Sequence, residues 1–377
     1  MRLDPPTPRH ARIRDFGGLD RLVALLIVGV FGAALLQTSN ARLTASSAIG
    51  SGHAVDAAAA PAPQNTKARV VVQPERVVAA ERHAATKAPA RRVAAKPVAA
   101  TPAKSAPKSA AVKAKPYVPT GTGMWIYQWH STAGGSAATI VRRAKWAGLS
   151  SLYLRTGSSW DGFTGAHALP ALLRATRGTD ISVIAWDFPK LRNPAWDARR
   201  LAHAAWVNRG RHTPHVVAVA PDIETPAEGT HNAAWRVRWY LRVLRSHLPK
   251  GVTILSTVPW PSIYRMGEYP YGTVAAHSDA LVPMAYWYNN PPGYVTTRSI
   301  RYLRQFHKPV APVGQGYDGK LDVPSLRHND LSRQVPVFLR TAKRVGAHGV
   351  SIWSWQNAKT ATWNALARAR HWFRPQR

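Results

Sequence analysis

The sequence predicts an α/β fold: a closed (β/α)₈ barrel of the TIM type, spanning residues 119–377. From Tyr117 onward, eight short apolar runs alternate with segments of helical pattern, and regular alternation of this kind indicates a parallel sheet. Eight strands in about 260 residues is the usual size of such a barrel. The run 216–222 ends in one acid, Asp222, and a second acid, Glu224, follows two residues later. Barrels of this type carry their catalytic residues at the C-terminal ends of the strands.

The expected strands are short and rich in branched or aromatic residues. They lie at about 124–129, 151–155, 181–186, 216–222, 252–257, 280–287, 309–313 and 349–353. The expected helices lie near 137–147, 168–175, 195–209, 232–247, 261–266, 295–306, 332–345 and 359–370, and the fifth has the weakest pattern. An open doubly wound sheet has the same alternation, but no glycine-rich phosphate-binding sequence follows the first strand.

An apolar segment lies near the N-terminus. Residues 1–21 are polar, and residues 22–36 form an uninterrupted apolar run of fifteen. This length is short for a membrane-spanning helix and typical of a signal-peptide core. Residues 39–41 (Ser-Asn-Ala) offer a cleavage site. We therefore interpret residues 1–41 as a cytoplasmic n-region followed by a signal peptide or an uncleaved membrane anchor. Both place the barrel outside the cytoplasm, either secreted or anchored in the cytoplasmic membrane.

A basic linker is predicted at residues 42–118. It consists mainly of Ala, Pro, Lys and Val, with thirteen Lys or Arg against three acids. Such a segment cannot bury enough apolar surface to fold, and Pro and like charge keep it extended. We expect a disordered spacer that attracts the anionic polymers of a cell wall. A histone-like tail has a similar composition, but the export segment in front argues against a specific nucleic-acid partner.

The composition of the whole chain narrows the function further. The net charge is +33, and the predicted barrel alone has 33 basic and 12 acidic residues. This favours polyanionic partners, although a genome biased towards Arg and Ala would explain it equally well. The absence of Cys excludes disulfides and thiolate metal sites. Fifteen Trp residues must line either a core or a ligand groove.

The stretch 216–225 carries the strongest functional signal. Side chains of a strand alternate between two faces. One predicted face packs outward with branched side chains: Val217, Val219 and Ile223. The other faces the barrel interior with small side chains and ends in two acids: Val216, Ala218, Ala220, Asp222 and Glu224. Only five Glu occur in the chain, so this acid pair stands out. The simpler alternative is a helix cap near Asn232.

The ends of the predicted strands are rich in aromatic and amide side chains. Flat aromatic faces suit sugar rings, whereas amides and carboxylates bind hydroxyl groups. The predicted substrate-binding residues are Trp129, Arg155, Trp186, Asp187, Trp260, Trp287, Gln315, Trp353 and Gln356. Beside them lie Gln128, His130, Tyr317 and Trp355. Each Trp taken alone fits a packing role, so the prediction of a polysaccharide or peptidoglycan-type partner rests on their accumulation at one rim.

Other chemistries lack their motifs. The histidines are scattered without an H-E-x-x-H pattern, so no metal site is expected. No G-x-S-x-G sequence and no P-loop occur, and no cofactor is expected. The paired carboxylates remain the best catalytic candidates.

From Gly121 to about Trp372 the chain resembles glycosidase-type barrels, which include chitinase-type enzymes and the Chalaropsis-type lysozymes. Chitinase-type enzymes end their fourth strand in Asp-x-Glu, as Asp222-Ile223-Glu224 does, and carry Met-x-Tyr on the sixth, as Met284-Ala285-Tyr286 does. Their eighth strand has a Trp under the sugar, which Trp353 matches. The late Trp355-Gln356 is similar to a Trp-Gln of the lysozyme type. Exported actinobacterial proteins with glycosidase-like barrels have the most similar overall pattern.

The sequence departs from these families at defined positions. Val217 and Ala220 stand where the chitinase signature has further Asp residues, and Trp287 follows the strand-six Tyr where an acid is expected. Residues 124–129 contain no Asp, which the lysozyme type has on its first strand. A degenerate, non-catalytic carbohydrate-binding barrel is therefore an open alternative, as is an envelope protein that binds polyanions.

A mechanism follows as a hypothesis. Glu224 would be the general acid, with its pKa raised by Asp222 and by aromatic burial. If the substrate has an N-acetyl group, its acetamide would be the nucleophile, oriented by Asp222 and hydrogen-bonded by Tyr286. The spacing of the two acids along the strand, about 6.6 Å, does not decide between retention and inversion. Asp187 would be either the base of a direct-water mechanism or a structural partner of Arg155.

Overall fold

The structure, a computed structural model, describes residues 117–210 and 213–373. The predicted export segment 22–36 and all but the end of the predicted linker lie outside these residues. Within the described ranges, no helix combines the length and the apolar character that crossing a membrane requires.

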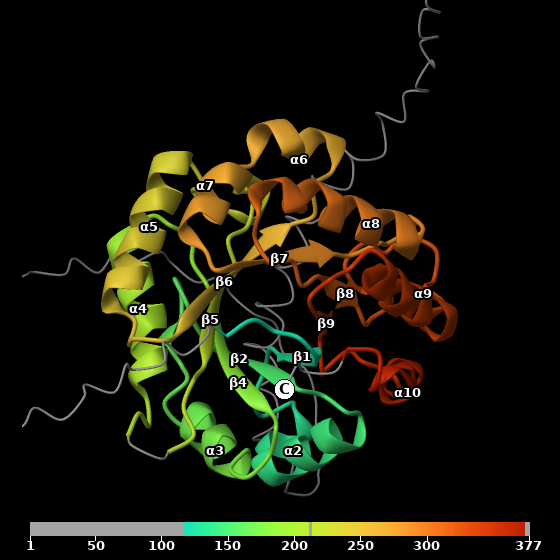
Figure 1. The fold of residues 1–377 in the computed structure, drawn as a ribbon, viewed down its shortest axis with the longest axis horizontal. Helices are drawn as coiled ribbons and strands as arrows, with labels where there is room; N and C mark the ends of the chain where they lie inside the picture. Colours follow the sequence, from blue (N-terminus) through green and yellow to red (C-terminus); the bar gives the residue numbers. More distant parts are fainter. Residues whose placement is uncertain (1–116, 211–212, 374–377) are drawn as a thin grey trace, which may run out of the picture. The chain divides into compact units, whose positions relative to one another are not determined.

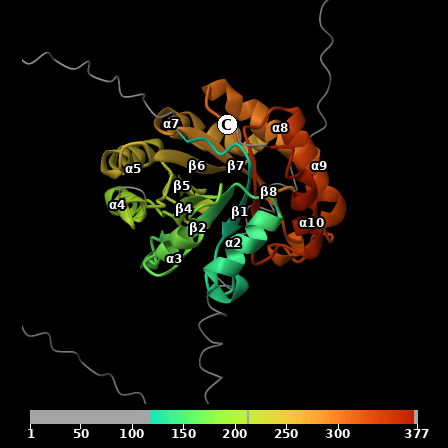
Figure 2. The same ribbon diagram turned by 60° about the horizontal axis from the view of Figure 1, so that its bottom comes forward.

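Eight parallel strands close into a barrel, so the predicted fold is confirmed (Figures 1 and 2). β1 pairs with both β2 and β9, which joins the two ends of the sheet. The strands are β1 (Thr122–Ile126), β2 (Ser151–Ser158), β4 (Ser182–Phe188), β5 (Ala218–Pro221), β6 (Thr253–Pro259), β7 (Ala280–Ala285), β8 (Val313–Gln315) and β9 (Val350–Trp353). A short β3 (Gly162–Phe163) folds back antiparallel on β2.

Helices surround the strands (Figure 2). They are α2 (Ala137–Trp146), α3 (Ala168–Ala175), α4 (Pro194–Trp206), α5 (Ala234–His247), α6 (Ile263–Glu268), α7 (Tyr271–His277), α8 (Pro292–Leu303), α9 (Leu331–Arg344) and α10 (Thr360–Ala369). Short 3₁₀ turns lie at η1 (Ala133–Gly135), η2 (Pro226–Glu228), η3 (Arg304–Phe306) and η4 (Gly319–Leu321). The eight expected helices are present, and α7 is an additional one.

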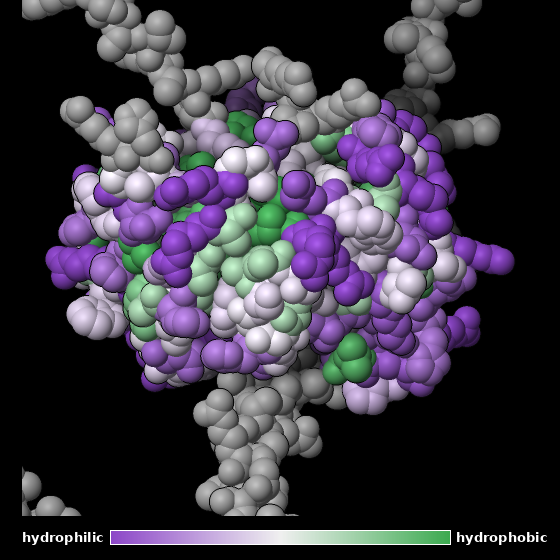
Figure 3. Space-filling view, turned by 90° about the horizontal axis from the view of Figure 1, so that it is seen from below, coloured by the Kyte–Doolittle hydropathy of each residue, from purple (hydrophilic) through white to green (hydrophobic). Residues whose placement is uncertain are grey.

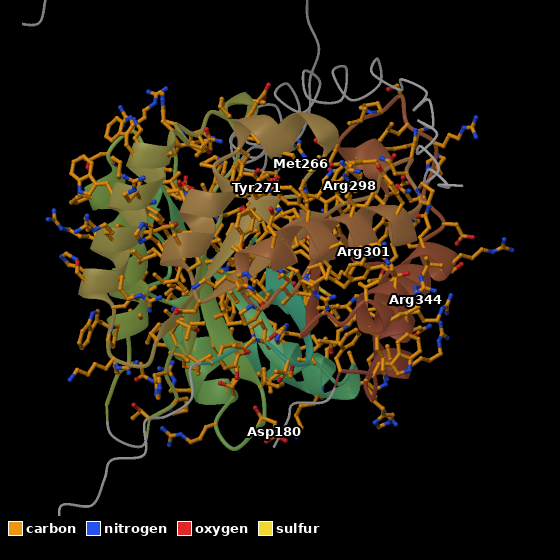
Figure 4. All side chains as sticks on the ribbon, turned by 45° about the horizontal axis from the view of Figure 1, so that its top comes forward. Asp180, Met266, Tyr271, Arg298, Arg301 and Arg344 are labelled. Atoms are coloured by element: carbon orange, nitrogen blue, oxygen red, sulfur yellow. The ribbon has the colours of Figure 1, made fainter. Side chains whose placement is uncertain are left out.

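Side-chain caps fix where several helices begin. Ser136, Asn193 and Asp330 each accept a hydrogen bond from a backbone N–H in the first turn of α2, α4 and α9, which satisfies donors that have no partner inside the helix. On α8, Arg298 donates from Nε to the carbonyl oxygen of Pro261, 2.9 Å away. It lies towards Met266 of α6 in Figure 4, and this contact ties α8 to the segment after β6.

Two cores form on the two faces of the sheet. The outer core lies between strands and helices, and the inner core fills the barrel. On β5, Ala218 and Ala220 belong to the inner core and Val219 to the outer one, as the predicted alternation requires. Val216 and Val217 are reversed from their predicted faces, because they precede the strand, which begins only at Ala218.

Tyr117 packs against the inner core at the N-terminal end of the barrel. Burial raises the pKa of its phenol to about 12, against the opposing effect of hydrogen bonds with Ser182 and Ser151, the first residues of β4 and β2. The folded part of the chain thus includes a residue two positions before the predicted barrel boundary. The opposite end, where the strands finish, is the one that carries the candidate site.

Hydrophilic residues predominate on the face drawn in Figure 3, with smaller groups of apolar residues between them. Some large apolar side chains nevertheless lie exposed on the helices, and most of these are tryptophans.

Candidate active site

Two hydrogen bonds hold the backbone of the segment after β5. The backbone N–H of Ile223 donates to the carbonyl oxygen of Thr257 on β6, 3.1 Å away, and the hydroxyl of Tyr269 donates to the carbonyl oxygen of Ile223 at 2.7 Å. Asp222 and Glu224 flank this anchored residue. Two carboxyl groups are therefore held at the C-terminal end of the barrel, where active sites of such barrels lie.

Asp222 is a buried acid at this end. Its side chain is 9% exposed, and Oδ1 has no hydrogen-bond partner among the described residues. Its pKa is raised to about 7, first by burial and then by the charges of Glu228 and Asp187, while Lys190 and Arg155 oppose the rise. The ionised form is thus disfavoured at this position.

Glu224 is half-buried and its pKa is raised well above the ordinary value. Burial is the largest cause, followed by the charges of Asp222 and Glu228, and the positive charges of Arg265 and Lys190 only partly offset them. The carboxyl group is therefore favoured in its protonated form, which is the form that a general acid requires.

Tyr286 follows β7 and lies near both acids. It is half-buried, and its pKa is raised first by burial and then by the charges of Asp222 and Glu224. Among the described residues, no hydrogen bond joins these three side chains to one another. They share one electrostatic environment, because the charge of each acid raises the pKa of at least one of the other two groups.

Asp187 ends the neighbouring strand in a different environment. Its side chain is fully buried, and Oδ2 lies 2.8 Å from Nε of Arg200 on α4. Its structural partner is thus Arg200 and not Arg155, which pairs instead with Asp161 at 2.6 Å. Without exposed surface, Asp187 does not line the site as predicted.

An aromatic cluster forms the floor of the site. Trp125 stacks on Tyr153 with ring centroids 4.4 Å apart, and Trp186 lies edge-on to Trp125 at 5.5 Å. Above them, Tyr127 and Trp353 are half-buried, with centroids 5.8 Å apart. Trp186 was predicted to contact substrate, but it is 2% exposed and supports the rings above it. Trp353 remains at the surface of the site.

Two further predicted contacts are wrong because their side chains are fully buried. Trp287 points outward to α9, where its Nε1 donates to Gln334 and its ring packs near Phe338. This orientation follows from strand alternation, since Tyr286 faces inward. Gln315 is used internally, because it accepts from the backbone N–H of Tyr288 at 2.8 Å and donates to the carbonyl oxygen of Tyr317 at 3.0 Å.

The remaining predicted residues lie at the rim. Gln356 joins two loops, since Nε2 donates to the carbonyl oxygen of Gln128 at 2.7 Å. The guanidinium of Arg155 lies 4.9 Å from the centroid of the Tyr127 ring. Trp129 and Trp260 are half-buried and pack against the outer core, so each presents only part of its ring.

Sequence reasoning missed Tyr127 and Lys190. Tyr127 lies two residues after the inward-facing Trp125, so strand alternation could have identified it. Lys190 is buried at 5% exposure, donates to the carbonyl oxygen of Glu228, and lies 4.1 Å from the centroids of both the Trp160 and Phe188 rings. Burial lowers its pKa to about 8, although Glu224 opposes this. No sequence motif marks Lys190.

The simpler helix-cap interpretation applies to a neighbouring residue. Thr225 caps η2 in a reciprocal pair with Glu228, whereas α5 begins without a side-chain cap. Within residues 117–210 and 213–373, no group of three or more His, Asp or Glu side chains is arranged to hold a metal ion.

No protein-family model matches the chain, and no curated protein matches it. Solved structures that it resembles are chitinases and other glycosidases with (β/α)₈ barrels. A chitinase from Chromobacterium violaceum matches at 12% identity and a TM-score of 0.48, over 67% of this chain and 99% of that one. Active domain 2 of a chitinase from Pyrococcus furiosus matches at 14% identity and a TM-score of 0.49, over 69% and 98%.

A putative α-L-fucosidase from Bacteroides thetaiotaomicron is similar to the same degree, at 13% identity and a TM-score of 0.48, over 70% of this chain and 99% of that one. At these identities and TM-scores the likeness carries no argument about this chain, and the barrel itself is established by its strand pairing. The chemistry has to be argued from the residues at its C-terminal end.

Proposed function

We propose that this protein hydrolyses glycosidic bonds in an envelope glycan that contains N-acetyl sugars, with Glu224 as the general acid. The observation that carries the proposal is the raised pKa of Glu224, on a half-buried side chain at the C-terminal end of the barrel. A raised pKa favours the protonated carboxyl group, which can donate its proton to a leaving glycosidic oxygen.

The neighbouring groups suit a mechanism in which the substrate assists. The acetamide oxygen of the sugar attacks the anomeric carbon while Glu224 protonates the departing oxygen, so that one bond forms as the other breaks. In its ionised form, which a pKa of about 7 allows at neutral pH and above, Asp222 accepts a hydrogen bond from the acetamide N–H and stabilises the positive charge that develops on it. Tyr286 donates its hydroxyl hydrogen to the acetamide carbonyl group. Trp353 supplies a flat apolar surface for the sugar ring.

The location of this activity is part of the proposal. The apolar run 22–36 supports export of the barrel, as a secreted or a membrane-anchored protein, and the basic residues of 42–118 support attraction to anionic wall polymers. The apolar run and all but the last two residues of the linker lie outside the described residues, so both proposals rest on sequence alone.

The test is release of reducing sugar from purified cell-wall glycan by the full-length protein. We expect release by the wild type and none above background by Glu224→Gln. The matched control is Glu268→Gln, the same substitution at an exposed residue of α6, which should leave release unchanged. Retained binding to the glycan without release by the wild type would contradict hydrolysis and favour the non-catalytic, sugar-binding barrel.

A further inference from the structure

The outer face of α5 exposes two tryptophans. Trp235 is 55% exposed and Trp239 is 48% exposed. Their rings lie 6.5 Å apart between centroids and within 24° of parallel. Water-exposed Trp is unfavourable because of its large apolar surface, so neighbouring exposed tryptophans mark interaction sites more often than isolated ones do.

The sequence of α5 contains two stripes with the same helical spacing. Val237, Tyr240, Leu241 and Leu244 form the buried stripe, and each is fully buried. Trp235, Arg238, Trp239 and Arg242 repeat the spacing of three, four and seven residues on the opposite side. We call this second set the α5 platform. The inner stripe alone anchors the helix to the barrel, so packing does not require the platform tryptophans.

The platform carries positive charge that no carboxylate neutralises. Within the described residues, neither Arg238 nor Arg242 forms an ion pair or a hydrogen bond, whereas Arg245 on the same helix pairs with Asp279. After burial, Arg238 and Arg242 are the largest causes that lower the pKa of His277 on α7. The surface beside the tryptophans is therefore electropositive.

Val243 and Ser246 adjoin the four platform residues along the outer surface of the same helix. Flat apolar rings next to unpaired guanidinium groups suit a polymer that presents both ring faces and anionic groups.

The platform begins at the same end of the barrel as the candidate active site. Asn232, two residues before α5, donates from Nδ2 to the carbonyl oxygen of Glu224, 3.2 Å away, and Trp235 lies in the first turn of the helix. A chain bound at the site can therefore continue over the rim and along α5, which Figure 1 shows on the outside of the barrel.

We propose that the α5 platform is a secondary binding site for an anionic glycan. Sugar faces stack on Trp235 and Trp239, and carboxylate or phosphate groups of the same strand bind Arg238 and Arg242. The choice of a glycan among polyanions rests on the proposed function. The exposed rings and the unpaired arginines are observations that do not depend on that function.

The test measures binding of a labelled hyaluronan oligosaccharide, which carries both carboxylates and N-acetyl sugars. Full-length protein with Glu224→Gln is used throughout, so that cleavage does not consume the probe and the linker contributes equally. We expect Trp235→Ala/Trp239→Ala to weaken binding about tenfold, the scale of lost ring stacking. Arg238→Gln/Arg242→Gln should weaken it to a similar extent and reduce its dependence on salt.

Matched variants keep the test specific. Trp146→Ala changes a Trp of α2 that is 53% exposed, and Arg340→Gln/Arg344→Gln changes an exposed pair on α9 with the same spacing as the platform arginines; Figure 4 labels Arg344. Both controls should leave hyaluronan binding unchanged.

Two results would overturn the proposal. One is that the platform variants bind hyaluronan as tightly as the control variants do. The other is an equal or greater loss of binding to single-stranded oligothymidylate, which would make the platform a nucleic-acid surface. Absence of sugar release by the wild type would contradict the proposed hydrolysis and leave this binding result unaffected.

Discussion

Two buried acids end neighbouring strands of the barrel, and they differ in what surrounds them. Asp187 on β4 lies 2.8 Å from Arg200, which also contacts Asp197 at 2.7 Å. Each acid has one carboxylate oxygen, Oδ1, without a hydrogen-bond partner among the described residues. Asp222 after β5 differs in that no ion pair within these residues involves it, while a second carboxyl group, that of Glu224, lies nearby. Burial raises the pKa of both, to about 6 for Asp187 and about 7 for Asp222.

The difference separates a structural acid from a candidate catalytic one. The charge of Asp187 is matched by a cation on α4, and the network extends to the backbone N–H of Leu191, which donates to Asp197 at 2.9 Å. Within residues 117–210 and 213–373, no cation forms an ion pair with the acids after β5, and their pKa values are raised by neighbouring carboxyl groups. Such an arrangement costs stability and is retained where a perturbed pKa serves chemistry.

Breaking the structural pair should have the largest effect on stability. Arg200→Met leaves Asp187 and Asp197 buried without their cation, and we expect the free energy of unfolding to fall by about 3–5 kcal/mol. Urea denaturation of the full-length protein measures it. Arg199→Met, at the exposed neighbouring position of α4, is the control, and an equal loss in both variants would show that the buried network contributes nothing specific.

Neutralising Asp222 should have the opposite effect and raise the free energy of unfolding. The pKa of Asp222 in the folded protein, about 7, lies above the ordinary 3.8, so the folded state binds the proton more tightly than the unfolded chain. Its contribution to stability is therefore present at low pH and lost as the pH rises from about 4 through 7. We expect Asp222→Asn to stabilise the protein by about 1–3 kcal/mol at pH 8.

This gain should shrink towards pH 4, where the wild-type carboxyl group is already protonated in the folded state. Melting temperatures of wild type and Asp222→Asn across pH 4–8 give the comparison. A stability difference that does not vary with pH would contradict the account of Asp222 as a buried acid with a raised pKa.

The smallest expected effect is a shift in the pH dependence of activity, caused by the charged residues around Glu224. Lys190 lowers the pKa of Glu224 and Glu228 raises it. Because activity is lost as the general acid deprotonates, Lys190→Met should move the alkaline limb of the pH profile of kcat/KM to higher pH, and Glu228→Gln should move it to lower pH. Shifts in the same direction would indicate loop distortion, since Lys190 also donates to the carbonyl oxygen of Glu228.

The sequence predicted the framework of the fold and the place of the acid pair. Regular β-α alternation gave the barrel, and strand alternation placed Ala218 and Ala220 inside it. The same rule, applied with Tyr286 facing inward, would have predicted that Trp287 faces outward towards α9 and does not contact substrate. The first strand ends at Ile126 rather than at residue 129, and this offset directed attention to Gln128 and Trp129 instead of Tyr127.

Other parts of the site depend on contacts between residues far apart in the chain. For Asp187, the sequence left open a base of a direct-water mechanism or a structural partner of Arg155 on the neighbouring strand, whereas the cation comes from Arg200 on the helix that follows. Lys190 approaches the acids only because the loops after β4 and β5 meet, through the hydrogen bond from the His231 N–H to the Lys190 carbonyl oxygen at 2.8 Å. Neither contact has a local pattern in the sequence.

The most direct test of the account compares two substrates that differ only in their leaving group. An aryl N-acetylglucosaminide with a strongly acidic phenol needs little protonation to depart, whereas a sugar leaving group needs a full proton transfer. We predict that Glu224→Gln lowers kcat/KM for cleavage between sugars by about 10²–10⁴-fold, as loss of general acid catalysis does, while retaining most activity on the activated aryl substrate. Equal losses on both substrates would contradict the role of Glu224 as the general acid.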